Sequence, residues 1–217
     1  MDYSKNKSKY DSTNKEIERA VTPGSKVLDI GCTTGKLAKA LKKKKCQVTG
    51  IDIDQTSLSL ARKYCQNTIL VDVEDRKVLA KKLRGEKFDV VVLGDVLEHL
   101  KYPEELLVAL KKHLKQNSFI ISSIPNSAFI WMRMKFLLGN FNYSKNGGLM
   151  DEDHLRFYSF QTAQALFERS GYKIISVKPS SHGINNPKYF AIKALAKIFP
   201  SIFAIHILIQ AQKKPTA

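Results

Sequence analysis

The sequence predicts an α/β fold built on a mostly parallel β-sheet. Short apolar runs alternate along the chain with segments of helical periodicity, which is the pattern of successive β–α–β units. The 217 residues are 43% hydrophobic and 26% charged, a balance typical of a globular chain and not of a disordered or low-complexity one. No linker rich in Pro, Gly or Ser divides the sequence, so we expect a single domain over residues 1–217.

Apolar runs and their spacing predict the first five strands and the helices between them. The strands are expected at Val27–Ile30, Val48–Ile53, Ile69–Val71, Phe88–Leu93 and Phe119–Ile124. The helices are expected at Gly35–Lys43, Thr56–Cys65, Lys77–Leu83 and Pro103–Leu114. The last helix begins with a proline in its first turn and repeats leucines along one face, which predicts that this face is buried.

After Pro125 the alternation stops and a long insertion follows. Residues 125–158 contain a helical segment, Ala128–Leu138, and several glycines. An insertion of this length beyond the fifth strand is typical of a lid or an acceptor-binding element.

The C-terminal part of the chain is expected to complete the sheet. Ser159 caps a predicted helix that ends before Gly171. Strands are expected at Tyr172–Lys178 and Phe203–Gln210. The segment Lys188–Phe199 between them predicts a basic amphipathic helix, which is compatible with peripheral contact with a membrane.

The three cysteines, Cys32, Cys46 and Cys65, form no C-x-x-C pair, so neither a disulfide framework nor a cysteine zinc site is indicated. Residues Met1–Lys15 are polar, and no apolar signal-peptide segment follows them. A reducing, cytoplasmic location is therefore expected. The most apolar stretch, Ile198–Ile209, is too short to span a bilayer.

The net charge of +16 admits three interpretations: nucleic-acid binding, an anionic membrane surface, or a lysine-rich solvated surface. The largest cluster, Lys42–Lys45, closes an expected helix, where cations suit the negative end of the helix dipole. No aromatic residues interleave with these lysines, so a base-stacking platform is not favoured.

Glycines follow the first strand directly, in the segment VLDIGCTTG at residues 27–35. Such a turn lets the backbone approach a ligand closely. Asp52 lies at the end of the second strand, 17 residues beyond Gly35, where a carboxylate can accept both hydroxyls of a ribose. Asp54 is expected instead to cap the following helix.

These segments resemble the class I S-adenosylmethionine-dependent methyltransferases. The resemblance is carried by VLDIGCTTGKLAKAL (27–41), VTGIDID (48–54), LVDVED (70–75) and FDVVVLGDVLEHL (88–100). It implies a Rossmann-like three-layer sandwich with a seven-stranded, mostly parallel sheet whose last strand is antiparallel. It also implies that S-adenosylmethionine is the cofactor and S-adenosylhomocysteine the product.

The resemblance assigns the cofactor to three turns. In this family the glycine-rich turn packs on the methionine part, the acid after the second strand holds the ribose, and an acid after the third contacts the adenine. The implied cofactor-binding residues are Asp29, Gly31, Cys32, Thr33, Gly35, Asp52, Ile53, Asp72, Val73 and Gly94. Thr33 departs from the family pattern, which most often has a glycine at that position.

The remainder of the chain resembles a bacterial subgroup of these enzymes that is often associated with cell-surface glycan assembly. The matching stretches lie at residues 123–143, 147–172 and 200–213. A small-molecule or glycan acceptor is therefore expected.

Methyl transfer from a sulfonium needs an oriented acceptor and a base or metal near the methyl group. Asp95, Glu98 and His99 follow the fourth strand in a D-x-x-E-H arrangement, and His154 lies in the insertion. This set resembles the E-x-x-E-H and His metal site of small-RNA terminal 2′-O-methyltransferases, and related residues occur in ubiquinone-pathway O-methyltransferases.

We expect catalytic roles for Asp95, His99 and His154, and we expect these three with Glu98 to form a candidate site for Mg²⁺ or Mn²⁺. The alternative is that Glu98 and His99 buttress the next helix and that His154 bonds to the backbone.

Other residues carry weaker signals. His113 is expected on a solvated helix face and His206 in the last strand. An acceptor pocket and simple packing are both compatible with Trp131, Met132, Met134 and Phe136.

Two further expectations concern the edges of the site. Arg156 suits either an anionic group of a substrate or an ion pair with Asp151 or Asp153. Residues 1–22, which include Tyr3 and Tyr10, are expected to form a flap over the cofactor.

The function that the sequence favours is S-adenosylmethionine-dependent O-methylation of a small molecule or glycan precursor. RNA ribose methylation is an alternative because of the charge. Methylation of base amines is disfavoured, because Leu93-Gly94-Asp95-Val96 stands where those enzymes carry an Asn/Asp-Pro-Pro-aromatic run. A non-catalytic cofactor-binding or membrane-surface adaptor is the third hypothesis.

Overall fold

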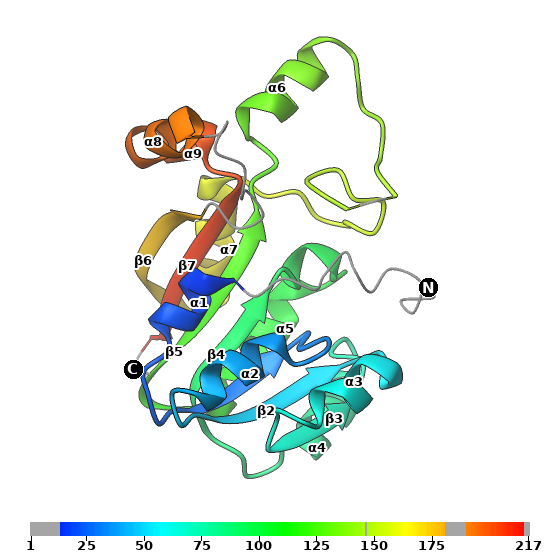
Figure 1. The fold of residues 1–217 in the computed structure, drawn as a ribbon, viewed down its shortest axis with the longest axis vertical. Coiled ribbons are helices and arrows are strands. Elements are labelled where there is room, and N and C mark those ends of the chain that lie inside the picture. The colour runs from blue at the N-terminus through cyan, green and yellow to red at the C-terminus, as the bar shows by residue number, and fades with distance from the viewer. Residues whose placement is uncertain (1–13, 146, 181–189, 215–217) are drawn as a thin grey trace.

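The computed structural model describes residues 14–145, 147–180 and 190–214. A seven-stranded sheet of order β3-β2-β1-β4-β5-β7-β6 forms the middle layer, and helices lie on both of its faces (Figure 1). Strands β1 to β5 pair in parallel, whereas β7 runs antiparallel to both β5 and β6. The predicted sandwich with an antiparallel last strand is confirmed.

The strands are β1 Lys26–Ile30, β2 Gln47–Asp52, β3 Asn67–Leu70, β4 Phe88–Gly94, β5 Leu114–Pro125, β6 Tyr172–Ser180 and β7 His206–Lys213. The α-helices are α1 Lys15–Ala20, α2 Lys36–Lys42, α3 Gln55–Ala61, α4 Arg76–Lys82, α5 Pro103–Leu110, α6 Ile130–Leu137, α7 Phe160–Arg169, α8 Phe190–Ile198 and α9 Pro200–Phe203. Two 3₁₀ turns, η2 Leu97–His99 and η3 Lys111–His113, precede and follow α5.

Each face of the sheet has its own apolar core, because successive strand residues point to opposite faces. In β4, Val91 and Leu93 pack with the helices α4, α5 and α7, whereas Val90 and Val92 pack with α1 and α2. The central strands are therefore apolar on both sides, which explains why they are visible in the sequence as continuous apolar runs.

The strand order reverses at β1, with β2 on one side and β4 on the other. In open α/β sheets a ligand crevice forms at the carboxyl ends of the strands at such a point. The chain places the glycine-rich turn, Asp52 and Asp95 at these ends.

The insertion between β5 and α7 is closed at its base by buried backbone contacts. Asn126 pairs with Tyr158 in an isolated bridge, and its backbone N–H donates to the carbonyl of Ile205 at 2.7 Å. The insertion carries α6 at its outer end (Figure 1).

Three expectations from the sequence were wrong in detail. Helix α5 ends at Leu110, and Leu114 instead pairs with Phe88 at the start of β5. The last strand begins at His206, because Pro200 starts a short helix, α9, whose first position tolerates proline. His113 is buried, not solvated, and its Nδ1 lies 3.1 Å from the carbonyl of Glu86.

Candidate active site

A cavity of about 660 Å³ opens at the carboxyl ends of β1, β2 and β4. Of the residues that the sequence assigns to the cofactor, all except Gly35 line it. The residues assigned to catalysis and metal binding, Asp95, Glu98, His99 and His154, line the same cavity. The fold thus brings residues that are far apart in the sequence, from Asp29 to His154, to the wall of one cavity.

The turn after β1 needs glycine at two positions. Gly31 and Gly35 have φ values of 73° and 77°, a conformation that L side chains rarely adopt. A Cβ on Gly31 would lie 2.7 Å from Val96 Cγ2, and one on Gly35 would lie 2.9 Å from Ala61 Cα. Gly35 therefore serves the packing of the turn against α3, which explains why it does not line the cavity.

Thr33 also has a positive φ, 45°. Its backbone N–H donates to Asp52 Oδ2 at 2.8 Å, so the turn is tied to the end of β2. The other oxygen of Asp52 accepts from the N–H of Asp54 at 2.9 Å. Burial raises the pKa of Asp52. As expected, Asp54 caps a helix, α3, by accepting from Thr56 and Ser57.

Asp29 is a buried carboxyl in the cavity wall, and its Oδ2 has no hydrogen-bond partner within the described part of the chain. Burial, and next the charge of Asp52, raise the pKa of Asp29 to about 7. Two carboxyl groups of one cavity wall thus favour a ligand that carries positive charge or hydrogen-bond donors.

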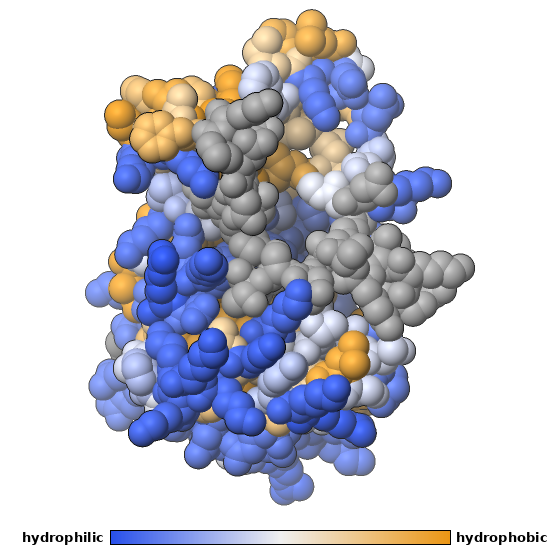
Figure 2. Space-filling view, viewed as in Figure 1, coloured by the Kyte–Doolittle hydropathy of each residue, from blue (hydrophilic) through white to orange (hydrophobic). Residues whose placement is uncertain are grey.

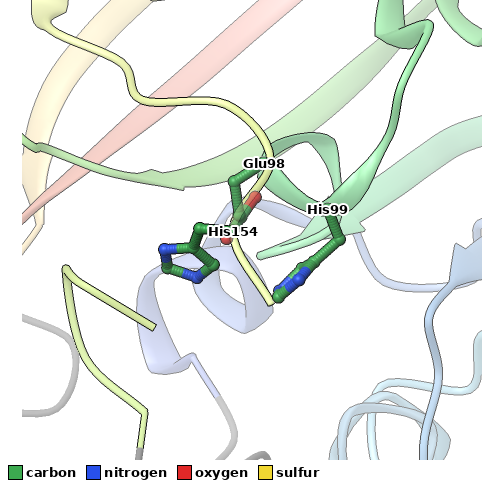
Figure 3. A group of neighbouring side chains, drawn as sticks. All are labelled: Glu98, His99 and His154. Carbon is green, nitrogen blue, oxygen red and sulfur yellow. The ribbon is translucent and has the colours of Figure 1, made fainter. Parts of the chain in front are cut away.

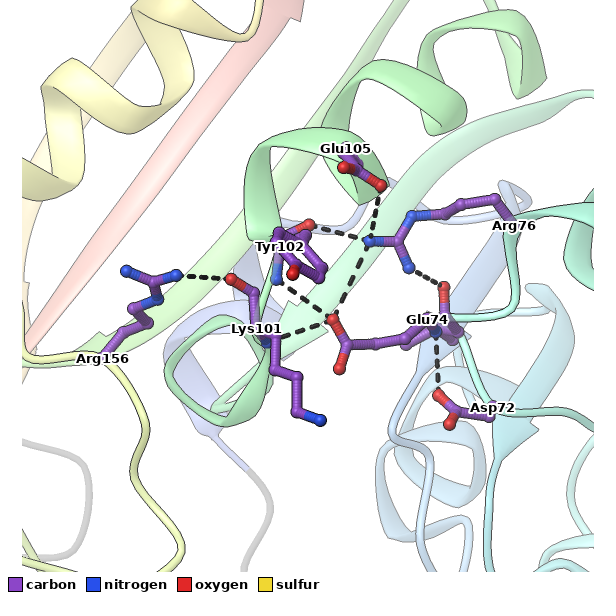
Figure 4. A network of polar contacts seen from close by, with 8 residues as sticks. Asp72, Glu74, Arg76, Lys101, Tyr102, Glu105 and Arg156 are labelled. Carbon is purple, nitrogen blue, oxygen red and sulfur yellow. Dashed lines mark hydrogen bonds and ion pairs between the residues drawn. The ribbon is translucent and has the colours of Figure 1, made fainter.

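A polar network links the loop after β3 to the loop before α5 (Figure 4). Glu74 Oε1 accepts from the backbone N–H groups of Lys101 and Tyr102 at 3.0 and 3.1 Å. Asp72 Oδ1 accepts from the N–H of Glu74 at 2.8 Å, which fixes Asp72 beside the cavity. Arg156 donates to the carbonyl of Lys101 at 2.5 Å, so it joins the insertion to this network.

Asp95 adopts a positive φ of 53° at the end of β4. Its Oδ1 accepts from Ser123 Oγ at 2.9 Å and lies 3.7 Å from His206 Nε2. His206 is in the last strand, as expected, but no pattern in the sequence indicates that it lines the cavity. Only the antiparallel pairing of β7 with β5, which places His206 opposite Pro125, brings it there.

The group that could hold a metal ion consists, within the described residues, of Glu98, His99 and His154, whose ligand atoms all lie within 4.8 Å of one another. Figure 3 shows these side chains gathered where η2 meets the insertion. Asp95, which the sequence also assigned to a metal, is not part of this group. Its carboxylate is engaged by Ser123 on the neighbouring strand.

Glu98 is 1% exposed, and neither carboxylate oxygen has a hydrogen-bond partner among the described residues. Burial, and next the charge of Asp95, raise its pKa well above the usual range. A buried carboxyl without partners is costly unless a proton, a cation or a ligand donor compensates it.

Backbone contacts bring His154 to η2. The N–H groups of Leu155 and Arg156 both donate to the carbonyl of Glu98, at 2.8 and 3.0 Å. The rings of His99 and His154 meet edge to face, 4.8 Å between centroids.

The carbonyl partners define the neutral tautomer of both imidazoles. His99 Nδ1 lies 3.0 Å from the carbonyl of Asp153, and His154 Nδ1 lies 3.4 Å from that of Leu149. A carbonyl only accepts, so each Nδ1 carries a proton, and in the neutral form of either ring the lone pair lies on Nε2. Burial, and next the charge of His99, lower the pKa of His154, which favours its neutral form.

The sequence left open whether side chains of α6 line an acceptor pocket, and it suggested that residues 1–22 cover the cofactor. Met132 is buried, whereas Trp131 and Met134 are exposed, and none of the three lines the cavity. Tyr3, Tyr10 and most of the proposed N-terminal flap lie outside the described residues, but Asn14 and Ile17 line the cavity. No helix in the described ranges is long and apolar enough to cross a membrane.

Comparison with known proteins identifies the family of the chain. A family model described as a methyltransferase domain matches residues 7–177. The ubiquinone biosynthesis O-methyltransferase of Pasteurella multocida is 36% identical over 114 residues, which cover 48% of this chain and 47% of that protein. The enzyme of the same name from Hahella chejuensis is 33% identical over 112 residues, 50% of this chain and 47% of that protein. The chain thus spans about half the length of these curated relatives.

Solved structures share the fold over nearly the whole chain. An S-adenosylmethionine-dependent methyltransferase from Archaeoglobus fulgidus has a TM-score of 0.65 and 19% identity, covering 95% of this chain and 97% of that one. The magnesium protoporphyrin IX methyltransferase of Synechocystis, solved with bound S-adenosylhomocysteine, has a TM-score of 0.60 and 17% identity, covering 91% and 78%.

Proposed function

The chain belongs to the methyltransferase-domain family and is a class I S-adenosylmethionine-dependent methyltransferase, and on that premise we propose that it methylates a hydroxyl group of a small molecule or glycan precursor. The observation that carries this proposal is the group of Glu98, His99 and His154 beside the cofactor turn, in one cavity. The similarity to O-methyltransferases over half of the chain supports an oxygen acceptor.

S-adenosylmethionine would occupy the part of the cavity bounded by the turn after β1. Asp52 would accept the ribose hydroxyls, and Asp72 and Val73 would lie beside the adenine. Asp29 would compensate positive charge on the methionine part of the cofactor, because its Oδ2 lacks a partner in the described protein.

In the proposed reaction the histidines would act at the acceptor. Bound S-adenosylmethionine would supply an activated methyl group: the acceptor oxygen would bond to the methyl carbon as the carbon–sulfur bond breaks, and the electron pair of that bond would stay on the cofactor sulfur. The proton of the acceptor hydroxyl would pass to Nε2 of His99 or His154, in the neutral form of that ring. Their Nδ1 contacts with the carbonyls of Asp153 and Leu149 hold the rings in the tautomer that can accept it.

As an alternative use of the same lone pairs, the three residues fit a divalent metal by their donor set: the carboxyl of Glu98 is buried, has no partner among the described residues, and lies within 4.8 Å of the ligand atoms of both imidazoles. A bound Mg²⁺ or Mn²⁺ would lower the pKa of an acceptor hydroxyl. Glu98 would be the anionic ligand, and Asp95 would remain with Ser123 outside the set.

The proposal is tested by a screen for methyl transfer from isotopically labelled S-adenosylmethionine to phenols, glycan precursors and RNA, with and without Mg²⁺ or Mn²⁺. Turnover with a phenol or glycan hydroxyl is expected. Transfer to RNA alone would replace the proposal with the ribose-methylation alternative.

With an acceptor in hand, His99→Ala and His154→Ala test the proposed roles. Removing the proton acceptor is expected to lower kcat about a hundredfold or more, while S-adenosylhomocysteine affinity stays unchanged. His113→Ala is the matched control, because His113 is also buried on a backbone carbonyl but lies outside the cavity. Full turnover in both cavity variants would refute the assignment.

A further inference from the structure

Large apolar side chains are exposed on two elements that the cavity does not use. On α6 and the residues after it these are Trp131, Met134, Leu137, Leu138, Phe141 and Tyr143. On α8 and just after it they are Phe190, Leu195, Ile198 and Phe199. We call these ten residues the apolar end. Leu137, Leu138 and Phe190 are each more than three-quarters exposed, at 79%, 78% and 77%.

The two parts of the apolar end lie at the same end of the molecule. Figure 1 places α6, α8 and α9 together at one end of the long axis. Figure 2 shows apolar surface gathered over both elements there, whereas the opposite end is mostly hydrophilic.

A buried polar link joins the bases of the two parts. Asn126, which precedes α6 and is 0% exposed, donates through Nδ2 to the carbonyl of Ala204 at 2.8 Å and to that of Ser201 at 3.2 Å. Phe129 and Met132 are buried and anchor α6, and the rings of Phe136 and Phe141 stack at 4.8 Å. The exposure of the apolar end is therefore a property of an ordered surface.

The charged side chains on α6 and α8 all have one sign. Residues 106–150 and 169–217 contain no Asp or Glu. Arg133 and Lys135 on α6, and Lys197 on α8, are exposed, and Lys193 is half-buried. Exposed large apolar side chains that gather at one end of a fold are typical of an interaction site, and cations beside them favour an anionic partner.

We propose that the apolar end docks this enzyme on an anionic phospholipid bilayer. Exposed Trp and Tyr among aliphatic side chains suit the boundary between headgroups and acyl chains, and lysines beside them suit anionic headgroups. A second copy of this chain fits less well, because two such surfaces would bring the cations of α6 and α8 against one another. The proposal is independent of the acceptor, since it concerns a surface outside the cavity.

Trp131 is the only tryptophan of the chain and is 54% exposed, so its fluorescence reports directly on this surface. The full-length protein is titrated with vesicles of phosphatidylcholine alone and of phosphatidylcholine and phosphatidylglycerol in equal parts. We expect a blue shift of the emission and co-sedimentation with the anionic vesicles, both weakened by high salt. No shift, or an equal response to both vesicles, would overturn the proposal.

Paired variants separate docking by the apolar end from unspecific attraction of a basic protein. Leu137→Ser with Leu138→Ser is expected to weaken vesicle binding about tenfold or more, whereas Leu60→Ser with Val108→Ser, at exposed positions elsewhere, leaves it unchanged. Lys193→Gln with Lys197→Gln is expected to reduce binding more than Lys77→Gln with Lys81→Gln on α4 does.

Equal losses in the two lysine pairs would contradict the proposal, because any basic face would then suffice. Sedimentation equilibrium on the same proteins provides a second check. A dimer that Leu137→Ser with Leu138→Ser dissociates would assign the apolar end to a second copy and overturn the bilayer.

Discussion

Three acidic residues of the cavity wall have buried carboxyl groups. Asp29, Asp52 and Glu98 all have raised pKa values, and burial is the first cause in each case. Such groups are costly in the empty fold and become useful when a ligand supplies donors or positive charge. Bound cofactor and acceptor are therefore expected to offset the free-energy cost of burying these carboxyl groups.

Asp52→Ala is expected to weaken S-adenosylhomocysteine binding about tenfold or more, because the ribose would lose a charge-assisted acceptor. Calorimetric titration measures the affinity. Asp75→Ala is the control, since Asp75 caps α4 and does not line the cavity. Unchanged affinity in the Asp52 variant would place the ribose elsewhere.

Asp29→Asn is expected to raise the melting temperature of the cofactor-free protein, and more so at higher pH. The folded-state pKa of Asp29 is about 7 against an ordinary 3.8, so the folded form holds this proton more tightly than the unfolded chain. The contribution of this bound proton to the stability of the folded protein is complete below the ordinary pKa of 3.8 and is lost as the pH rises through about 7. The melting-temperature gap between variant and parent should therefore grow by about 5 °C between about pH 5 and about pH 8.

At the scale of elements, contacts between distant segments decide which residues meet. β7 carries His206 to the cavity, and the carbonyl of Glu98 binds the insertion at Leu155 and Arg156. Helix α7 begins with a capping box between Ser159 and Thr162, which fixes where the insertion ends. These links make the insertion a wall of the cavity.

Tyr172→Phe is expected to lower the free energy of unfolding by about 1–2 kcal/mol, because the Tyr172 hydroxyl donates to the buried carbonyl of Leu107 at 2.8 Å and so joins β6 to α5. Denaturant titration measures the change. Tyr102→Phe, at an exposed position before α5, should leave stability nearly unchanged, and equal losses in both variants would argue against the buried bond as the cause.

At the scale of the molecule, the cavity draws on β1, β2, β4, η2 and the insertion together. A ligand that fills it contacts segments from residue 14 to residue 206. Binding is therefore expected to stabilise the fold as a unit.

S-adenosylhomocysteine at about a hundred times its dissociation constant is expected to raise the melting temperature by about 5–10 °C. Differential scanning fluorimetry checks this shift. The Asp52→Ala protein should show a smaller shift at the same ligand concentration, and no shift in the parent protein would count against cofactor binding in this cavity.

The sequence alone predicted the α/β fold class, most of the parallel sheet and the glycine turn that follows β1. These features depend on local patterns: apolar runs for strands buried on both faces, leucine spacing for α5, and glycines where the turn after β1 needs positive φ or close approach. Local patterns also predicted that Asp54 caps α3.

Which distant residues meet, and which side chains are buried, was decided by the tertiary structure and could not be predicted from periodicity. The tertiary structure left Asp95 outside the group of ligand atoms formed by Glu98, His99 and His154, with its carboxylate accepting from Ser123 on the adjacent strand. It buried His113 and brought His206 to the cavity, and it left the apolar residues of α6 and α8 exposed at one end. Each outcome depends on pairing between residues far apart in the chain, and no spacing within one segment encodes such pairing.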